Sequence, residues 1–294
     1  MSMVTLNGNT YKRFKNMRTN TWVVTFLIVF FLCSAISPIL RAQEELSAIV
    51  KKTAPSTGKE KTFAEWKMSS TAEQQTPDKG KEIFNKMVDA IGGRAAIMAV
   101  KNKVYSADVT LATAQGEQEL AIVATIEYPD KVHMKISIQG ETMERVVSGL
   151  QGKVTISGAS EAMQSPEVQE MRSNFLRDVV WLVQNADSLQ MQFIEEVIIA
   201  TVKVAKISLT AQDGRMVVIA VDTKTNLPNR FIYQVRSQEP PVLEENILGD
   251  FRSVGDILFP YRQFITNGGK VIQESRIKEI NINQTVNPDL FIIK

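Results

Sequence analysis

Apolar and polar residues alternate with a period of two through residues 103–139. The stretch divides into three segments, in which every second residue is apolar and most of its neighbours are polar. Because successive side chains of a β-strand point to opposite faces, the pattern predicts three strands with one apolar and one polar face each. Turn-forming residues at 114–116 and 129–130 separate the segments. The stretch therefore predicts an antiparallel meander whose apolar face needs a cover.

More strands follow on both sides of a helical stretch. Two are expected at 142–148 and 153–157, and seven more at 190–197, 202–211, 215–221, 229–236, 244–251, 261–267 and 271–282. Helical spacing predicts a helix from Pro77 to Ile91 capped by Thr76, a short one at 94–100, and a long one at 166–185 capped by Ser165. No alternation of single strands with helices appears. The pattern predicts a mostly β, α+β fold: one strongly curved antiparallel sheet of about 11–12 strands, an incomplete barrel, with helices over its concave face.

The N-terminal region has the pattern of an export signal. Lys12, Arg13, Lys15 and Arg18 precede an uncharged apolar stretch from Trp22 to Leu40, and a small-residue cleavage site ends at Ala42. We therefore interpret residues 1–42 as a signal peptide. An uncleaved membrane anchor is the alternative, because the apolar stretch is long enough to span a bilayer. Both interpretations place the rest of the chain outside the cytoplasmic membrane, in the periplasm.

Composition changes after the signal. Residues 43–75 are rich in Lys, Ser and Thr and have little apolar periodicity, so they are expected to form a flexible tether. Residues 76–294 are expected to form the folded domain. The 294-residue chain has a net charge of +2 and no basic, aromatic-rich patch, which argues against nucleic acid as a partner.

The search for catalytic and metal-binding groups favours a non-enzymatic protein. The only histidine, His133, falls on the polar face of its strand beside Lys131 and Lys135, and is expected to face solvent. One histidine and one cysteine, Cys33, exclude multi-histidine zinc sites and internal disulfides. Neither a nucleophile elbow nor a phosphate-binding glycine loop is present. The pairs Glu195–Glu196 and Glu244–Glu245 are expected to be solvated edge charges on opposite faces. No cofactor and no metal are expected.

Four motifs together resemble a known family. The first motif is DTKTNLPNR at residues 222–230. The second is Gly249-Asp250-Phe251, followed by VGDILFP at 254–260. The third is ININ at 280–283 with DLF at 289–291, and the fourth is DAIGG at 89–93. In this order they resemble the turn, strand and C-terminal signatures of the outer-membrane lipoprotein carrier, or lipoprotein-sorting, superfamily (LolA/LolB-like). The resemblance covers roughly residues 79–294.

The resemblance implies a fold and a function. The fold is an incomplete β-barrel whose hollow, lidded by helices, takes the acyl chains of lipoproteins. By that implication the protein is a carrier or chaperone of the envelope, with acyl chains or lipids as partners and envelope proteins as further candidates. The lipid-binding residues would be those on the apolar face of the meander, with two from a later strand: Leu120, Ile122, Ile126, Val132, Met134, Ile136, Ile138, Phe231 and Tyr233. The alternative is a non-catalytic interaction or sensory module of the same fold with a filled core.

Overall fold

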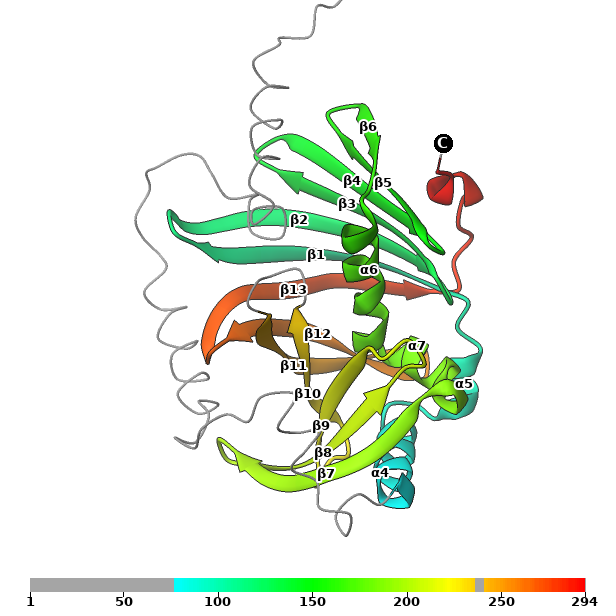
Figure 1. Cartoon of the computed structure of the whole chain (residues 1–294), viewed down its shortest axis with the longest axis vertical. Coiled ribbons are helices and arrows are strands. Elements are labelled where there is room, and N and C mark those ends of the chain that lie inside the picture. Colours follow the sequence, from blue (N-terminus) through cyan, green and yellow to red (C-terminus); the bar gives the residue numbers. More distant parts are fainter. Residues whose placement is uncertain (1–76, 236–240, 294) are drawn as a thin grey trace, which may run out of the picture.

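The fold is built on one curved β-sheet. The computed structural model describes residues 77–235 and 241–293. All thirteen strands in these residues form a single sheet, in the order β6-β5-β4-β3-β2-β1-β13-β12-β11-β10-β9-β8-β7. The sheet curves strongly without closing into a barrel, and helices lie on its concave side (Figure 1). The predicted fold class, an incomplete antiparallel barrel with helices over its concave face, is confirmed.

The first half of the sheet is the predicted meander and its extension. Its strands are β1 (Asn102–Thr113), β2 (Gly116–Glu127), β3 (Lys131–Ile138), β4 (Glu141–Ser148), β5 (Gln151–Ile156) and β6 (Ala159–Ala162). The alternation is visible in their burial: Leu120 is 7% exposed on the concave face, whereas Val123 is 46% exposed on the convex face. The four-residue edge strand β6 was not predicted, because its sequence ASEA carries no apolar alternation.

The second half contains seven longer strands. They are β7 (Gln190–Ile199), β8 (Val202–Thr210), β9 (Met216–Asp222), β10 (Pro228–Val235), β11 (Val242–Val254), β12 (Ile257–Asn267) and β13 (Lys270–Ile282). All seven were predicted, and the turn expected at Gly255-Asp256 is present, but β11 runs on to Val254 and β12 begins already at Ile257, so both strands are longer than expected. The final strand β13 pairs with β1, which joins the two halves into one sheet.

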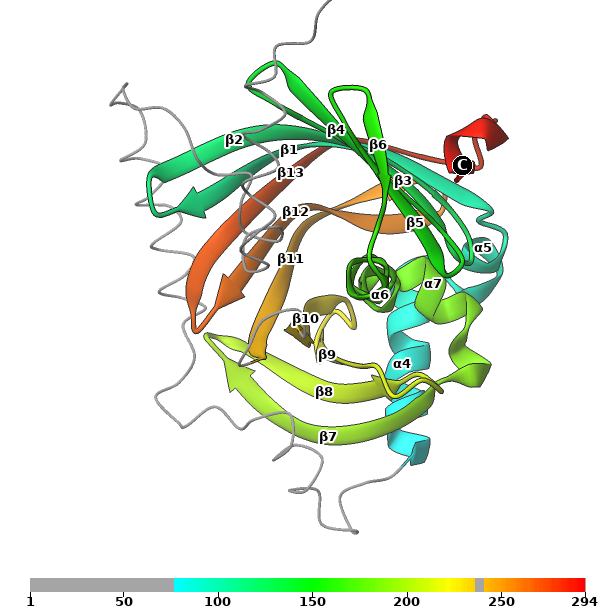
Figure 2. The same ribbon diagram turned by 45° about the horizontal axis from the view of Figure 1, so that its top comes forward.

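The topology explains why helices cross the concave side. Strands β6 and β7 lie at opposite edges of the sheet but are consecutive along the chain. The connection between them crosses the open side as α6 (Ser165–Ser173), the 3-10 turn η1 (Asn174–Arg177), α7 (Val179–Gln184) and η2 (Ala186–Ser188). Figure 2 shows α6 running through the interior of the curved sheet. A helical lid is therefore a consequence of the strand order.

The prediction of one long helix at 166–185 is wrong. The backbone at Asp178 is extended, with φ −108° and ψ 116°, so the helix is interrupted there. The Asp178 carboxylate accepts hydrogen bonds from the backbone N–H groups of Val180 (2.9 Å) and Trp181 (3.4 Å) and starts a new helix. Ser165 is not the cap of the first helix either. Gln164 occupies that position, and its backbone N–H donates to Glu167 Oε2 at 2.8 Å.

The N-terminal helices close one end of the sheet. Helix α4 (Pro77–Ala90) and helix α5 (Arg94–Met98) agree with the predicted ones, and the predicted cap Thr76 lies outside the described residues. Gly92, with φ +131°, ends α4 where the chain meets the turn before β12. A Cβ atom at Gly92 would stand 2.2 Å from the Asp256 carbonyl oxygen, so only glycine fits there.

Two hydrophobic clusters hold helices against the sheet. The main core joins α4, α5, η1 and α7 to strands β7 to β13, with Met87, Leu182, Ile207 and Ile219 each fully buried. A second cluster seats α6 and η1 on β3 and β4, and Val168, Met171 and Phe175 pack there on Val132 and Val147. No described helix is long and apolar enough to cross a membrane. The predicted signal (1–42) and tether (43–75) lie outside the described residues.

Candidate functional site

The candidate site is the concave surface of strands β1 to β4. The strand registers place apolar residues side by side: Ala107 opposes Ile122, Ile122 opposes Ile136, and Ile136 opposes Met143. Directly opposed residues of an antiparallel pair lie on the same face of the sheet, so the side chains of these four residues all point to the concave side. Ala107, Val109, Leu120 and Ile136 are its buried members, and Tyr105, Leu111, Ile122, Met134, Ile138, Met143 and Ile277 pack around them. We call this set the apolar wall.

The apolar wall differs from the two other clusters in its partners. Every one of its members lies on a strand, β1, β2, β3, β4 or β13, whereas the other two clusters both include helix residues. Several wall residues, Ile122, Met134 and Ile138 among them, are only partly buried. Among the described residues, therefore, no helix residue belongs to this cluster, although Tyr105 and Ile277 at its border also pack on the main core.

The nine residues predicted as lipid contacts are divided among three places. Leu120, Ile122, Met134, Ile136 and Ile138 belong to the apolar wall. Val132 and Ile126 are next along the same face, in the cluster that seats α6. Phe231 and Tyr233 pack in the main core, 1% and 6% exposed. The meander residues thus form one continuous surface, while the two aromatic residues lie on the facing half of the sheet.

An arginine on the concave face was missed by the sequence analysis. Arg145 opposes Met134, and its Nε is buried without a hydrogen-bond partner. Burial lowers the pKa of Arg145, although the nearby Glu167 carboxylate of α6 acts in the opposite direction. The signal was present in the alternation of β4, where Met143, Arg145 and Val147 occupy the same phase. An arginine between two apolar residues of the same face indicates that its guanidinium group points to the interior of the curved sheet.

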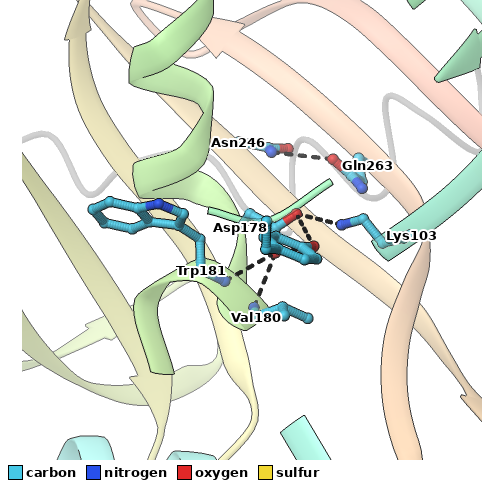
Figure 3. Close-up of polar contacts among 7 residues, drawn as sticks. Lys103, Asp178, Val180, Trp181, Asn246 and Gln263 are labelled. Carbon is cyan, nitrogen blue, oxygen red and sulfur yellow. Dashed lines mark hydrogen bonds and ion pairs between the residues drawn. The ribbon is translucent and has the colours of Figure 1, made fainter. Parts of the chain in front are cut away.

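A buried polar cluster bounds the wall at its helical end (Figure 3). The Lys103 ammonium pairs with Asp178, and the Tyr128 hydroxyl donates to the same carboxylate, 3.1 Å from each oxygen. Lys103 and Asp178 are 13% and 9% exposed. Burial, together with the Asp178 charge, raises the pKa of Tyr105 to about 12, so this phenol stays neutral. The Trp181 indole N–H donates to the Pro129 carbonyl at 2.9 Å and ties α7 to the meander.

A second polar cluster lies between η1 and strands β10 and β11. The Tyr233 hydroxyl donates to Glu244 Oε2 at 3.0 Å, and the Arg177 guanidinium stacks 3.8 Å from the Tyr233 ring. Burial raises the pKa of Glu244, and it raises that of Glu170 on α6 as well. The prediction that Glu244 is a solvated edge charge is wrong, since β11 is an interior strand and the residue is 8% exposed. The opposite orientation of Glu245 is confirmed by its ion pair with Arg230 on the other face.

His133 lies on the convex face, as its phase predicts, but it is not exposed to solvent. Its side chain is 12% exposed, and Nε2 lies 3.3 Å from Glu144 Oε2. The C-terminal turn η3 (Pro288–Phe291) folds back over β3 and β4 and helps to bury this face. The prediction of solvent exposure failed because a distant segment covers the strand. Among the described residues, no group of three His, Cys, Asp or Glu side chains could hold a metal ion.

Comparisons with known proteins were made by sequence and by structure. No family model and no curated protein sequence matches the chain. Three solved structures align with it at a TM-score of 0.50. The first is an outer-membrane lipoprotein-sorting protein domain from Vibrio parahaemolyticus, 12% identical over 74% of this chain and 97% of that one.

The other two structures have the same TM-score as the first. A LolA superfamily protein from Nitrosomonas europaea is 13% identical over 73% of this chain and 97% of that one. A DUF1329 family protein from Desulfovibrio piger is 10% identical over 72% of this chain and 97% of its own. At such identities the likeness concerns the fold. The curved sheet with its crossing helices is therefore LolA-like in its fold, as the sequence motifs indicated.

Proposed function

We propose that this protein is an exported, non-catalytic carrier or chaperone of the cell envelope, which shields the acyl chain of a lipoprotein or lipid against its concave face. The observation that carries the proposal is the apolar wall, whose members all come from strands. An apolar surface on the inside of a curved sheet, without a helix of its own, is suited to cover an apolar ligand. The LolA-like fold supports the same function.

The proposed contacts follow from the positions of the side chains. Leu120, Ile122, Met134, Ile136 and Ile138 form the surface for the chain, and Ile126 and Val132 extend it toward α6. A ligand would reach Tyr233 only if η1 moved, because Arg177 covers its ring. His133 and Glu144, two residues of types that often serve in general acid–base catalysis, pair on the convex face, away from the apolar wall.

A second candidate function has an observation of its own. The main core and the α6 cluster fill much of the concave side with packed side chains. The packing of this helix-covered part of the sheet favours a second function, an interaction module with a filled core. Such a module would recognise another envelope protein through its outer surface. The two functions differ in whether the apolar wall binds a ligand.

A matched pair of substitutions distinguishes them. Ile136→Glu places a carboxylate in the apolar wall, where the side chain is 8% exposed. Val123→Glu makes the same chemical change on the convex face of β2, opposite Lys135, where the residue is 46% exposed. We expect Ile136→Glu to lower the affinity for a dansyl-labelled fatty acid at least tenfold, because an unpaired charge is unfavourable in an apolar site. Val123→Glu should bind like the wild type.

Thermal melting without ligand completes the test. If the wall is a binding surface, the carboxylate introduced by Ile136→Glu stays partly hydrated and the domain still folds. If the wall is part of a closed core, the buried charge costs several kcal/mol, about 3–5, and the domain unfolds. Absence of probe binding by the wild type, together with loss of folding in Ile136→Glu, would leave the interaction module as the function.

A further inference from the structure

The concave face carries a row of polar side chains beside the apolar wall. The strand registers pair Asn246 with Ile265, Ile265 with Gln273, Gln273 with Leu111, and Leu111 with Gln118. These five residues cross β11, β12, β13, β1 and β2 in sequence, and directly opposed residues share one face. Polar and apolar side chains alternate along the row. Its member Leu111 belongs to the apolar wall, so the row forms one border of that wall.

Both ends of the row have an unsatisfied hydrogen-bonding atom. Asn246 is 8% exposed, its Nδ2 donates to Gln263 Oε1 at 3.1 Å (Figure 3), and its Oδ1 has no partner. Gln118 Oε1 is likewise buried and unpartnered. If the Asn246 amide were flipped, its other polar atom would lack a partner, so one atom is unsatisfied in either orientation. Buried polar atoms without a partner are rare in native proteins and call for a physical explanation.

The surroundings of the row indicate what would satisfy these atoms. A free amide oxygen accepts a hydrogen bond from an N–H or O–H group. The apolar wall continues directly from the row through Val109 and Leu120, which oppose each other on the next row of the same face. A ligand that lies along both surfaces has an apolar chain on the wall and a hydrogen-bond donor at the row. The torsion that turns an asparagine amide is soft, so Oδ1 can rotate toward such a group.

We propose that Asn246 forms a subsite that recognises a hydrogen-bond donor at the point where the acyl chain of the ligand joins its polar head. The donor is the N–H of an amide link or the O–H of a glycerol-type head. The subsite rests on the proposed function, because it orients a ligand whose chain occupies the apolar wall. It adds selectivity, since an acyl ligand without a donor would leave the Asn246 oxygen unsatisfied.

Four dodecanoyl probes test the subsite: N-propyl dodecanamide, its N-methylated form, propyl dodecanoate and monododecanoylglycerol. Their affinities for the full-length protein are measured by displacement of a dansyl-labelled fatty acid. The amide should bind about 5–10-fold more tightly than its N-methylated form, as expected for one buried hydrogen bond of about 1 kcal/mol or more. Tight binding of the amide alone identifies an amide link, and tight binding of the glycerol ester alone identifies a hydroxyl donor.

The variants locate the effect. Asn246→Leu removes the acceptor at similar volume. The variant should bind the amide and its N-methylated form with about equal affinity, and its affinity for the N-methylated form should equal that of the wild type. Gln118→Met removes the other unpartnered oxygen, four strands away at the far end of the row, and should keep the amide preference. Asn281→Leu is the control, because Asn281 bonds Glu279 on the exposed face of β13.

The outcomes separate the subsite from the function on which it rests. Equal wild-type affinities for all four probes would overturn the subsite, with a buried water as the partner of Asn246, while the carrier function would stand. A donor preference that survives in Asn246→Leu would overturn it as well. If no probe displaces the dansyl ligand or binds at all, the carrier function fails and the subsite fails with it.

Discussion

Asp178 connects the helical connection to the sheet through three different interactions. Its carboxylate caps α7, pairs with Lys103 on β1 and accepts the hydroxyl hydrogen of Tyr128 after β2. Each partner comes from a different part of the chain, so this one side chain sets where α7 begins and where it meets the meander. The Lys103 side chain is only 13% exposed, so its ammonium group would be poorly solvated without the Asp178 carboxylate.

Replacing Asp178 is therefore expected to be severe. Asp178→Ala removes the cap and leaves Lys103 unpaired, and should lower the free energy of unfolding by about 3–5 kcal/mol. Asp178→Asn keeps a capping oxygen and should be about 1 kcal/mol less destabilising than the alanine variant. Tyr128→Phe, which leaves both cap and ion pair, serves as the control with a loss near 1 kcal/mol. Urea unfolding measures all three, and equal stability of Asp178→Ala and Tyr128→Phe would contradict the assigned role.

Glu244 gives the molecule a pH dependence of predictable sign. Burial raises its pKa above the ordinary value of 4.5, although the Tyr233 hydrogen bond opposes the shift. The folded state then holds its proton at a pH where the unfolded state has lost it, so this contribution to stability is complete below pH 4.5 and is lost as pH rises through the folded pKa. Glu244→Gln should remove that loss, and its stability relative to the wild type should increase with pH above 4.5.

Tyr233→Phe provides the matched comparison for Glu244. Without the phenol donor the charged carboxylate is less favoured, so the pH-dependent loss of stability should become larger. Chemical unfolding at several pH values between 4 and 8, about one unit apart, measures both variants. A constant difference between Glu244→Gln and the wild type across that range would show that the carboxyl is not perturbed.

At the scale of elements, α6 lies close to the sheet because one strand residue has no side chain. Gly152 on β5 faces the helix, and a Cβ atom there would stand 2.8 Å from Val168 Cγ2 and 3.1 Å from Met163 Cβ. Val147, its partner on β4, is fully buried in the same cluster. The helix therefore rests on β4 and β5 at a distance that only glycine allows.

Gly152→Ala tests this close approach. The added methyl group should displace α6 or its neighbours and destabilise the domain by about 1–3 kcal/mol. Gly249→Ala on β11 is the control, because a Cβ atom there meets only the Arg262 carbonyl oxygen at 3.9 Å. In that open position the same change should be neutral or should stabilise the domain by about 0.4–1 kcal/mol, because alanine lowers the conformational entropy of the unfolded chain. Equal effects in thermal melts would exclude close packing at Gly152 as the cause.

At the scale of the whole molecule, the strand order determines which part of the concave face the crossing helices cover. Because β6 and β7 are opposite edges, the connection between them covers only the part of the concave face that it crosses. The α6 and main clusters occupy that part, and the apolar wall lies beyond it. A single chain thus provides both a packed support and an apolar surface, the surface on which we propose that the ligand lies.

The export signal is a prediction about the whole chain that concerns residues outside the described structure. The charged start, the apolar stretch and Ala42 predict a mature protein that begins at Gln43. N-terminal sequencing of protein from the periplasmic fraction of an expressing bacterium should show Gln43. Recovery of the intact start in the membrane fraction would establish the anchor instead. Brief trypsin treatment of the mature protein should then remove the tether and leave a fragment that begins near residue 76.

The sequence determined the local features of this protein. Period-two alternation located twelve strands, since the side-chain pattern of a half-buried strand depends only on the chain itself. It also placed Leu120, Ile136 and their neighbours on one face of the meander, and the motifs at 222–230 and 254–260 indicated the LolA-like fold. Strand β6 escaped because a short polar edge strand carries no such alternation.

Tertiary structure decided what local patterns cannot contain. Helical spacing runs unbroken through 166–185, yet the pairing of Asp178 with Lys103 and Tyr128 favours an interruption, and those partners are distant in sequence. Glu244 is buried because it lies on an interior strand, and His133 is partly buried on a face over which the C-terminal turn folds. The row from Asn246 to Gln118 exists only through registers among five strands. Burial, ion pairs and shared faces depend on which segments meet, and that is a property of the folded chain.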